Sequence, residues 1–165
     1  MDIELLEATK DDLPTLDNLA QLYQYDFSEF AGGDVDTEGL FGFVGFDSLF
    51  DKPVHRAFLI RVDGRIAGFA TAYRGEAFRD PSEELWWMDE FFVMKKYRGK
   101  GVGEYVAREI FDRLPGTWEV GQISPNTSAQ AFWRRVIGRY TDDDYEEIVI
   151  DDKRWNGPVQ YFTSR

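Results

Sequence analysis

The chain has 165 residues, of which 43% are hydrophobic and 30% charged, so it can bury a core, and we expect one domain over residues 1–165. Its 31 Asp and Glu residues outnumber 19 Lys and Arg, and the formal net charge of −12 argues against nucleic acid or an anionic membrane as a partner. Cysteine is absent and His55 is the one histidine, which excludes thiolate ligands and a Cys nucleophile and leads us to expect no metal centre.

The first third of the chain predicts a strand followed by a helix. Residues 3–8 are typical of a short strand, and Thr9 with Asp12 has the spacing of an N-terminal capping box. Apolar side chains then recur every three or four residues through residues 13–27, which indicates one face of an amphipathic helix. Residues 28–53 combine many glycines with aromatic residues and indicate a loop or a short helix.

The middle of the chain predicts a hairpin and a central strand. Two β-rich runs, residues 56–62 and 65–73, flank Asp63-Gly64, a dipeptide that favours a tight hairpin turn because the turn needs positive φ. After an acidic loop, residues 85–93 form an apolar and aromatic run that suits a central strand.

The last third alternates helices and strands. Valine, isoleucine and leucine four residues apart predict a helix from about Gly103 to Leu114, and Pro115-Gly116 ends it. Residues 117–123 suit a strand. Asn126 or Ser128 then caps a helix that we expect to run to Ile137, with Gly138 as its C-terminal cap.

Two strands close the chain, over residues 145–150 and 159–163, with residues 156–158 as the connecting turn. The resulting order is β, α, β-hairpin, β, α, β, α, β, β. We therefore predict a mixed α/β (α+β) fold with one strand-helix-strand crossover at its centre.

The segment from Asp89 to Gly103 is the most informative part of the sequence. It follows a predicted strand and opens a predicted helix, so its backbone N–H groups converge at a positive helix end, which suits an anion. Glycines in this turn remove Cβ atoms that would keep a phosphate from those amides. Four cations lie in six residues with no acid among them, namely Lys95, Lys96, Arg98 and Lys100.

Two nucleotide-binding patterns fail in this segment. Gly101 stands after Gly99-Lys100 where a Walker loop needs Ser or Thr, and Val106 stands where a dinucleotide fingerprint needs its last glycine. A generic nucleotide-phosphate binder therefore stays a weaker alternative.

The pattern that does match is RxxGxG, formed by Arg98, Gly101 and Gly103 after a strand ending in Val93. It resembles the acyl-CoA pyrophosphate loop of the GNAT superfamily of N-acetyltransferases. The resemblance covers nearly the whole chain in element order and residues 85–138 in motif detail.

A second element supports the same resemblance. Asn126, Ala129 and Phe132 form an NxxAxxF pattern, which is followed by an aromatic residue and a glycine, as in the family's second cofactor element. Residues 21–30 also resemble a bacterial group of predicted acetyltransferases whose substrate is unknown.

The resemblance implies a GNAT-like fold with a mostly antiparallel, twisted sheet of about seven strands flanked by helices, and a central β-α-β crossover that binds acyl-CoA. It implies acetyl-CoA as co-substrate, with main-chain groups of Phe91 and Val93 holding the pantetheine arm. An amide near Phe92 or Val93 would polarise the thioester carbonyl. The residues to which it assigns acetyl-CoA contacts are Phe91, Phe92, Val93, Arg98, Gly99, Lys100, Gly101, Val102, Gly103, Asn126, Ala129, Phe132 and Trp133.

Acyl transfer to an amine needs a base, because an ammonium ion has no lone pair with which to attack. Strand alternation puts Asp89 on the face of Phe91 and Val93 and Glu90 on the opposite face, unless a bulge intervenes. By resemblance to the polyamine branch of the family, Asp89 is the first candidate, acting through water, and Glu90 is the second. Either carboxylate could instead be a structural ion-pair partner or attract a cationic substrate.

Trp133 departs from the family pattern, in which many members have a tyrosine that protonates the leaving thiolate. An indole N–H donates a hydrogen bond but has no useful acidity. The proton could come from water, Tyr140 or Tyr97. Alternatively, the protein is a non-catalytic acyl-CoA-binding or sensor domain.

The expected acceptor is a small-molecule amine, and the surplus of acid would favour a cationic one. An aromatic acceptor pocket could include Tyr23, Tyr25, Phe46, Trp86, Trp87, Phe91 and Phe92, although core packing explains these side chains equally well. Because no basic N-terminal leader or membrane-length apolar run occurs, we expect a cytoplasmic protein. A homodimer through the terminal strands or the Trp-rich surface stays open.

Overall fold

The computed structural model describes residues 1–42, 46–52 and 54–164. Within them, seven strands form one sheet in the order β1-β2-β3-β4-β5-β7-β6. The strands are β1 (Ile3–Glu7), β2 (His55–Val62), β3 (Arg65–Glu76), β4 (Glu84–Val93), β5 (Thr117–Gly121), β6 (Glu146–Asp152) and β7 (Trp155–Thr163). The helices are α1 (Leu13–Ala31), α2 (Val102–Arg113) and α3 (Thr127–Thr141), with short 3₁₀ helices η1 (Lys10–Asp12), η2 (Phe46–Asp51) and η3 (Lys95–Tyr97).

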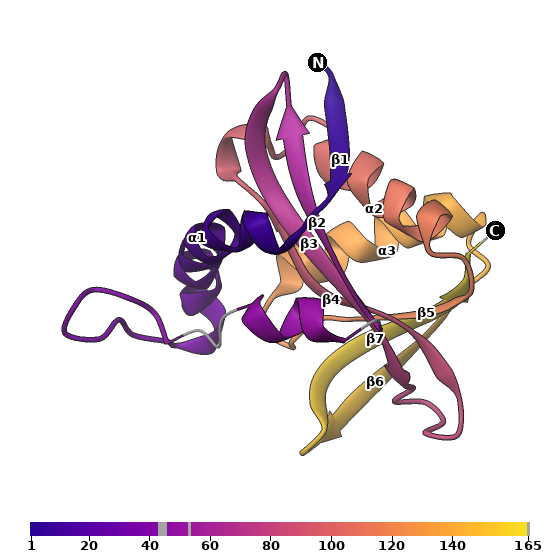
Figure 1. Cartoon of the computed structure of the whole chain (residues 1–165). Helices are drawn as coiled ribbons and strands as arrows, with labels where there is room; N and C mark the ends of the chain where they lie inside the picture. The colour runs from indigo at the N-terminus through magenta and orange to yellow at the C-terminus, as the bar shows by residue number, and fades with distance from the viewer. Residues whose placement is uncertain (43–45, 53, 165) are drawn as a thin grey trace.

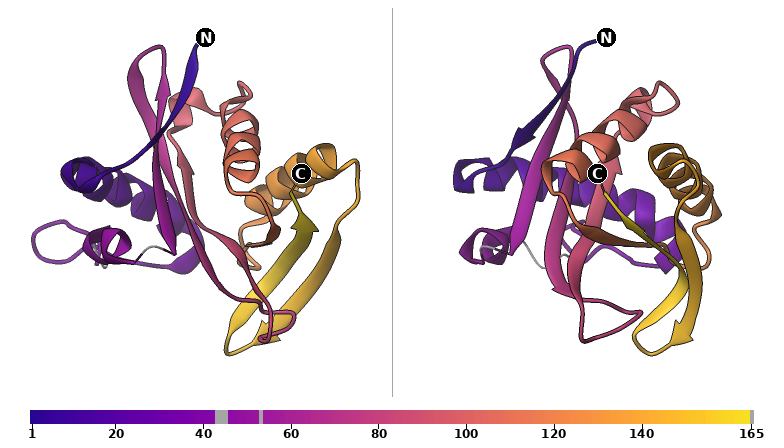
Figure 2. Two further views of the ribbon diagram at one scale, coloured as in Figure 1. Left: turned by 45° about the vertical axis from the view of Figure 1, so that its right-hand side comes forward. Right: turned by 90° about the vertical axis from the view of Figure 1, so that its right-hand side faces the viewer.

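The helices cover both faces of the sheet. Helix α1 packs on one face, and α2 and α3 pack on the other, as Figure 1 and the left view of Figure 2 show. The apolar stripe predicted for the first helix buries Leu16, Leu19 and Ala20 against the sheet. Helix α2 likewise turns Val106 and Ile110 into the larger core between the sheet and the two helices.

Adjacent strands are antiparallel except for β4 and β5, which are parallel and joined by α2. The predicted mixed, mostly antiparallel fold with a central crossover is therefore confirmed. In the described residues β4 and β5 pair at two positions only, Trp86 with Trp118 and Trp87 with Glu119. Beyond these positions the two strands diverge, so one edge of the C-terminal half of β4 is left without a neighbouring strand.

A β-bulge interrupts β4 at Asp89. Thr71 of β3 pairs with Glu90, whereas the next residue, Ala72, pairs with Met88, so Asp89 is the extra residue. The Thr71 hydroxyl, which is fully buried, accepts a hydrogen bond from the Glu90 N–H and donates one to Asp89 Oδ2, each over 3.1 Å. The simple alternation that placed Asp89 with Phe91 is therefore wrong, and both carboxylates lie on the α1 side of the sheet.

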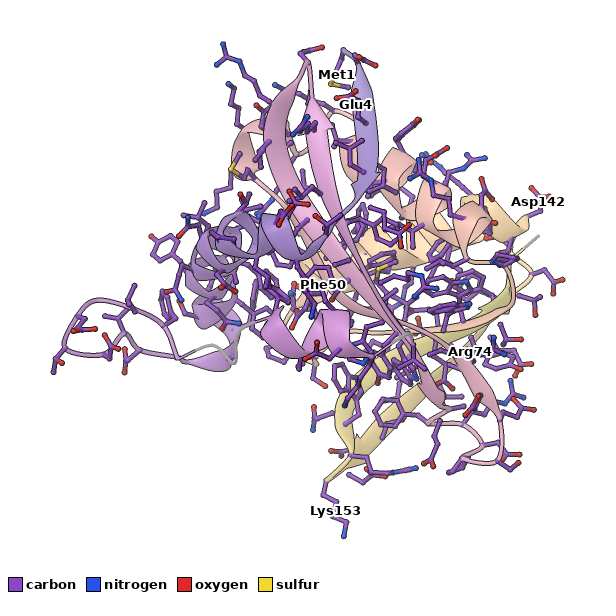
Figure 3. All side chains as sticks on the ribbon, in the orientation of Figure 1. Met1, Glu4, Phe50, Arg74, Asp142 and Lys153 are labelled. Carbon is purple, nitrogen blue, oxygen red and sulfur yellow. The ribbon has the colours of Figure 1, made fainter. Side chains whose placement is uncertain are left out.

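Some predicted boundaries are also wrong. Helix α3 continues through Gly138 to Thr141 and is capped by Asp142 in the left-handed conformation, φ 56° (Figure 3). Gly138 serves close packing instead, because a Cβ there would lie 2.6 Å from Asp143 Oδ1.

The β6–β7 turn falls at Lys153-Arg154, and Lys153 projects from its tip in Figure 3. The predicted turn at residues 156–158 lies inside β7. There Gly157 has φ +146°, and a Cβ would lie 2.0 Å from the Gln122 carbonyl oxygen, so the glycine permits a close approach of two backbones. Of the predicted loop or short helix at 28–53, residues 43–45 and 53 lie outside the described residues; the rest includes the end of α1 and all of η2.

Helix capping by Asn126 is confirmed, since its Oδ1 accepts a hydrogen bond from the Ala129 N–H over 3.0 Å.

In the part of the chain that the structure describes, every helix is too short or too polar to cross a bilayer.

Candidate active site

A cavity of about 510 Å³ opens where β4 and β5 diverge, between α1, the loop that enters α2, and the start of α3. The predicted cofactor residues that line it are Phe91, Phe92, Val93, Arg98, Gly99, Gly101, Gly103, Asn126, Ala129, Phe132 and Trp133. Lys100 and Val102 were predicted with them but do not line the cavity. Lys100 is exposed to solvent, and Val102, the first residue of α2, is buried in the core. One cavity thus gathers residues from both motif segments.

The glycines of the loop have two different structural tasks. Gly99 and Gly101 have φ of +69° and +83°, left-handed conformations that would strain other residues, and Gly101 is the N-cap of α2. A Cβ at Gly103 would meet the Phe132 ring at 3.1 Å, so this glycine lets α2 approach α3. The first-turn N–H groups of α2 consequently begin at the cavity wall, where their partial positive charge suits an anionic ligand.

Two loop cations are paired with a carboxylate from α1. Arg98 donates from Nε to the Val93 carbonyl over 2.5 Å, and its guanidinium also donates to Asp26. The Lys95 ammonium lies 3.3 Å from the other Asp26 oxygen. Arg98 therefore ties the loop, the end of β4 and α1 together.

Sequence reasoning missed two further sets of cavity residues. Helix α1 contributes one wall, with Asp26, Phe27, Glu29 and Phe30 beside Tyr23. Their three- and four-residue spacing could have placed them on one helix face, but not against this loop. Arg135 of α3 also lines the cavity, with its guanidinium 5.8 Å from the Phe132 ring centroid.

Trp133 is part of an aromatic cluster at the base of the cavity. It is buried and packs edge-on against Phe91 and Phe132, with ring centroids 4.9 and 5.0 Å away. Asn126 uses its carbonyl oxygen to cap α3, so only its amide NH₂ group can donate to a ligand.

The two candidate bases, Asp89 and Glu90, do not line the cavity; they lie beside it on the α1 face of β4. Desolvation raises the pKa of Glu90 to about 7, opposed by the nearby Tyr23 hydroxyl and assisted by the charge of Asp89. Desolvation also raises the pKa of Asp89, against the effects of the Thr71 hydroxyl and of nearby His55.

Tyr23 of α1 connects these carboxylates with the cavity. It lines the cavity, and its hydroxyl lies close enough to the Glu90 carboxylate for each group to shift the pKa of the other. Desolvation and the charge of Glu90 raise the pKa of Tyr23 well above its usual range. Its ring is held edge-on against Phe69 at 5.9 Å and tilted against Phe92 at 5.8 Å.

The two tyrosines predicted as proton donors lie elsewhere. Tyr140 is buried in the core beneath α2 and donates to Asp112 over 2.7 Å. Tyr97 is buried in η3, and neither residue lines the cavity. Among the described residues, no group of three or more His, Asp or Glu side chains is placed to hold a metal ion.

The model of the Acetyltransferase (GNAT) family matches residues 16–138, and the chain belongs to this family. The matched region includes most of α1, β4, the glycine-rich loop and most of α3, and therefore all the residues that line the cavity. The general chemistry of this family is acetyl transfer from acetyl-CoA. No curated protein matches the sequence at a significant level.

Several solved structures share the fold. A Corynebacterium glutamicum protein described as histone acetyltransferase HPA2 and related acetyltransferase has TM-score 0.69 and 16% identity, covering 100% of this chain and 98% of its own. An acetyltransferase from Thermus thermophilus has TM-score 0.66 and 16% identity over 99% and 97%. An aminoglycoside acetyltransferase from an uncultured soil metagenomic sample, in complex with sisomicin, has TM-score 0.62 and 19% identity over 91% and 93%.

Proposed function

We propose that the protein transfers the acetyl group of acetyl-CoA directly to a primary amine of a small, cationic acceptor. The observation that carries this proposal is the cavity itself, which joins a glycine-rich helix N-terminus to the open edge of β4, beside the exposed carboxylate of Asp89 and the partly buried one of Glu90. No covalent enzyme intermediate is needed, because the amine can attack the thioester within the same cavity.

The cofactor half of the proposal rests on charge and backbone geometry. The pyrophosphate would lie against the first-turn amides of α2, with Arg98 and Arg135 in the cavity wall as counter-charges. The unpaired edge of β4 near Phe91 and Val93 offers backbone groups to the pantetheine arm, in place of the strand that β5 does not supply. An amide at this edge would stabilise the oxyanion that develops on the thioester carbonyl.

For the deprotonation of the acceptor amine, we assign the role of general base to Glu90 in preference to Asp89. A general base works best with a pKa near the working pH, and the pKa of Glu90 is raised to about 7. Glu90 also lies near Tyr23, whose side chain lines the cavity, whereas one oxygen of Asp89 accepts a hydrogen bond from Thr71. We assign proton removal to Glu90 and attraction of the ammonium group to Asp89.

A cationic acceptor is supported by the two neighbouring carboxylates and by the net charge of −12. The metagenomic aminoglycoside acetyltransferase that shares the fold was solved with the aminoglycoside sisomicin. Polyamines and aminoglycosides are therefore the first acceptors to test. A cytoplasmic location and a homodimer stay predictions.

The test combines ligand binding with turnover. Acetyl-CoA should raise the melting temperature, and Arg98→Gln should reduce this rise, whereas Arg108→Gln, on an exposed turn of α2, makes the same charge change away from the cavity and should not. Release of free CoA is then followed with spermidine, sisomicin, lysine and short peptides as acceptors. Absence of a thermal shift at millimolar acetyl-CoA contradicts the proposal.

Trp133 favours one alternative, a non-catalytic acyl-CoA sensor, because the indole cannot protonate a leaving thiolate. The sensor predicts the same thermal shift with no CoA release from any acceptor. A single acceptor that is turned over with saturation kinetics excludes it.

A further inference from the structure

The inner end of the cavity is closed by three aromatic side chains, which we call the aromatic cluster: Phe91, Phe132 and Trp133. Along β4 the cavity wall includes residues 91–93 but not Glu90, so the cavity ends at Phe91. The Phe91 ring packs edge-on against Trp133, with 4.9 Å between ring centroids, and its centroid lies 5.9 Å from that of Phe132. The centroids of Phe132 and Trp133 are 5.0 Å apart, so each ring contacts the other two.

The residues behind the aromatic cluster leave it no room to move. Trp133 is 6% exposed, and its ring centroid lies 6.4 Å from that of Phe111. Phe111 and Ile137 are fully buried in the same core. On the side of α2, a Cβ at Gly103 would lie 3.1 Å from the Phe132 ring. Because close-packed side chains cannot admit another methylene group without leaving their preferred rotamers, this side of the cavity is rigid.

The opposite wall, formed by α1, is held less firmly. The buried residues of α1 lie between residues 16 and 20, whereas the cavity is lined by its second half, from Tyr23 to Phe30. The contacts of this half include the ring pair of Tyr23 with Phe92 and the ion pairs of Asp26 with two exposed cations. Exposed ion pairs stabilise a structure only weakly. A ligand would therefore displace α1 more easily than the aromatic cluster, and the aromatic cluster sets the size limit.

We propose that Trp133 determines which acyl chains the protein binds: it admits the acetyl group and excludes chains of butyryl length or longer. The assignment rests on the proposed binding of acetyl-CoA, with the pyrophosphate at the N-terminus of α2 and the pantetheine arm along the open edge of β4. In that binding mode the acyl group is the part of the ligand farthest along β4 from the glycine-rich loop, so it lies beside Phe91. A longer chain would have to enter the space that the Trp133 ring fills.

A smaller side chain at position 133 should turn exclusion into binding. Trp133→Leu leaves an apolar space between Phe91, Phe111 and Phe132, and spaces of this kind stay free of water and bind apolar groups. Each methylene group that enters such a space from water should tighten binding by about fourfold. A gain in affinity for longer acyl chains is a result that a general loss of structure cannot produce.

Calorimetry with acetyl-CoA, butyryl-CoA and hexanoyl-CoA is the direct test, because it measures binding without turnover. In the wild type we expect the Kd for hexanoyl-CoA to exceed that for acetyl-CoA by about tenfold or more, since overpacking a rigid core is unfavourable. In Trp133→Leu, hexanoyl-CoA should bind at least as tightly as acetyl-CoA. The matched control is Trp118→Leu, which makes the same change in the same core but outside the cavity wall, and it should keep the wild-type ratio of Kd values.

Trp133→Phe and Trp118→Phe replace the leucine variants where those do not fold, since a phenyl ring leaves less of the core empty. Trp133→Phe should lower the ratio of the Kd for butyryl-CoA to that for acetyl-CoA, and Trp118→Phe should not.

The outcomes separate the role of Trp133 from the proposed function. Equal binding of acetyl-CoA and hexanoyl-CoA by the wild type overturns the role of Trp133 alone, as does a wild-type ratio in the Trp133 variants or an equal shift in the Trp118 variants. Binding with the expected ratios but without CoA release to any amine supports this role and contradicts acetyl transfer. A wild-type protein that binds none of these acyl-CoAs overturns both.

Discussion

Arg98, on the glycine-rich loop, donates a hydrogen bond to the carboxylate of Asp26 on α1. The same carboxylate lies 3.3 Å from Lys95. Asp26 thus pairs with two cations that, in the proposed binding mode, would face the acyl-CoA pyrophosphate. On that proposal the ligand competes with Asp26 for them, and the competition sets part of the affinity for acetyl-CoA.

Replacing Asp26 by Asn should therefore tighten acetyl-CoA binding. Exposed ion pairs are worth up to about 1 kcal/mol, so we expect the Kd for acetyl-CoA to fall by about fivefold. This effect should become smaller as the salt concentration is raised. Calorimetry at low and high salt measures it. Glu29→Gln is the control. Glu29 lines the same wall, and its replacement removes the same charge, but the ion pairs of Lys95 and Arg98 are with Asp26. Equal gains in both variants would show that net charge alone sets the affinity.

Thr71→Val should destabilise the fold through the bulge in β4. The substitution keeps the shape of a fully buried side chain but removes a hydroxyl that serves Glu90 N–H and Asp89 Oδ2. A buried donor left without a partner costs about 1–3 kcal/mol, which urea denaturation measures. Thr71→Ser retains the hydroxyl and should lose less. A Val variant as stable as the wild type would mean that water makes the hydrogen bonds that the Thr71 hydroxyl makes at the bulge.

Glu90→Gln should stabilise the folded protein above neutral pH. The folded state binds the Glu90 proton more tightly than the unfolded chain does, so ionisation of Glu90 costs nothing below pH 4.5 and its full amount above about pH 7. A rise in pKa from 4.5 to about 7 corresponds to about 3 kcal/mol. The difference in unfolding free energy between variant and wild type, measured from about pH 5 to 8, should grow with pH. A difference that stays flat contradicts the raised pKa.

Gly157→Ala should be among the most damaging single-methyl changes in the chain. The new Cβ would lie 2.0 Å from the backbone oxygen of Gln122, which cannot move without separating β7 from the end of β5. We expect a loss of about 3 kcal/mol or more in thermal or urea unfolding. Gly33→Ala is the control, since a Cβ there meets no atom within 4 Å, and it should change stability by well under 1 kcal/mol.

The features that sequence predicted well are local ones. An anion-binding turn needs only neighbouring residues, so Arg98, Gly101 and Gly103 could be found from their spacing, and the Asp63-Gly64 hairpin likewise follows from its own turn. The seven strands also follow from local apolar runs. Element boundaries were wrong where glycine serves close packing, at Gly138 in α3 and at Gly157 in β7.

The features that sequence could not predict depend on contacts between distant segments. The bulge at Asp89 arises from Thr71 on the partner strand, and a rule of strict alternation cannot anticipate an extra residue. The packing of Tyr23 against Phe69 and Phe92 depends on where α1 lies on the sheet, which helical periodicity alone does not give. The glycine-rich wall of the cavity was therefore predicted, whereas on the α1 wall only Tyr23 was.

The short pairing between β4 and β5 contains two tryptophans that give the protein an intrinsic spectroscopic signal. The indoles of Trp86 and Trp118 stack there, 6.0 Å apart with an interplanar angle of 26°, and this close pair should produce coupled near-ultraviolet circular dichroism. Neither indole lines the cavity, so a change in this signal on addition of acetyl-CoA would report that the two strands have moved relative to each other.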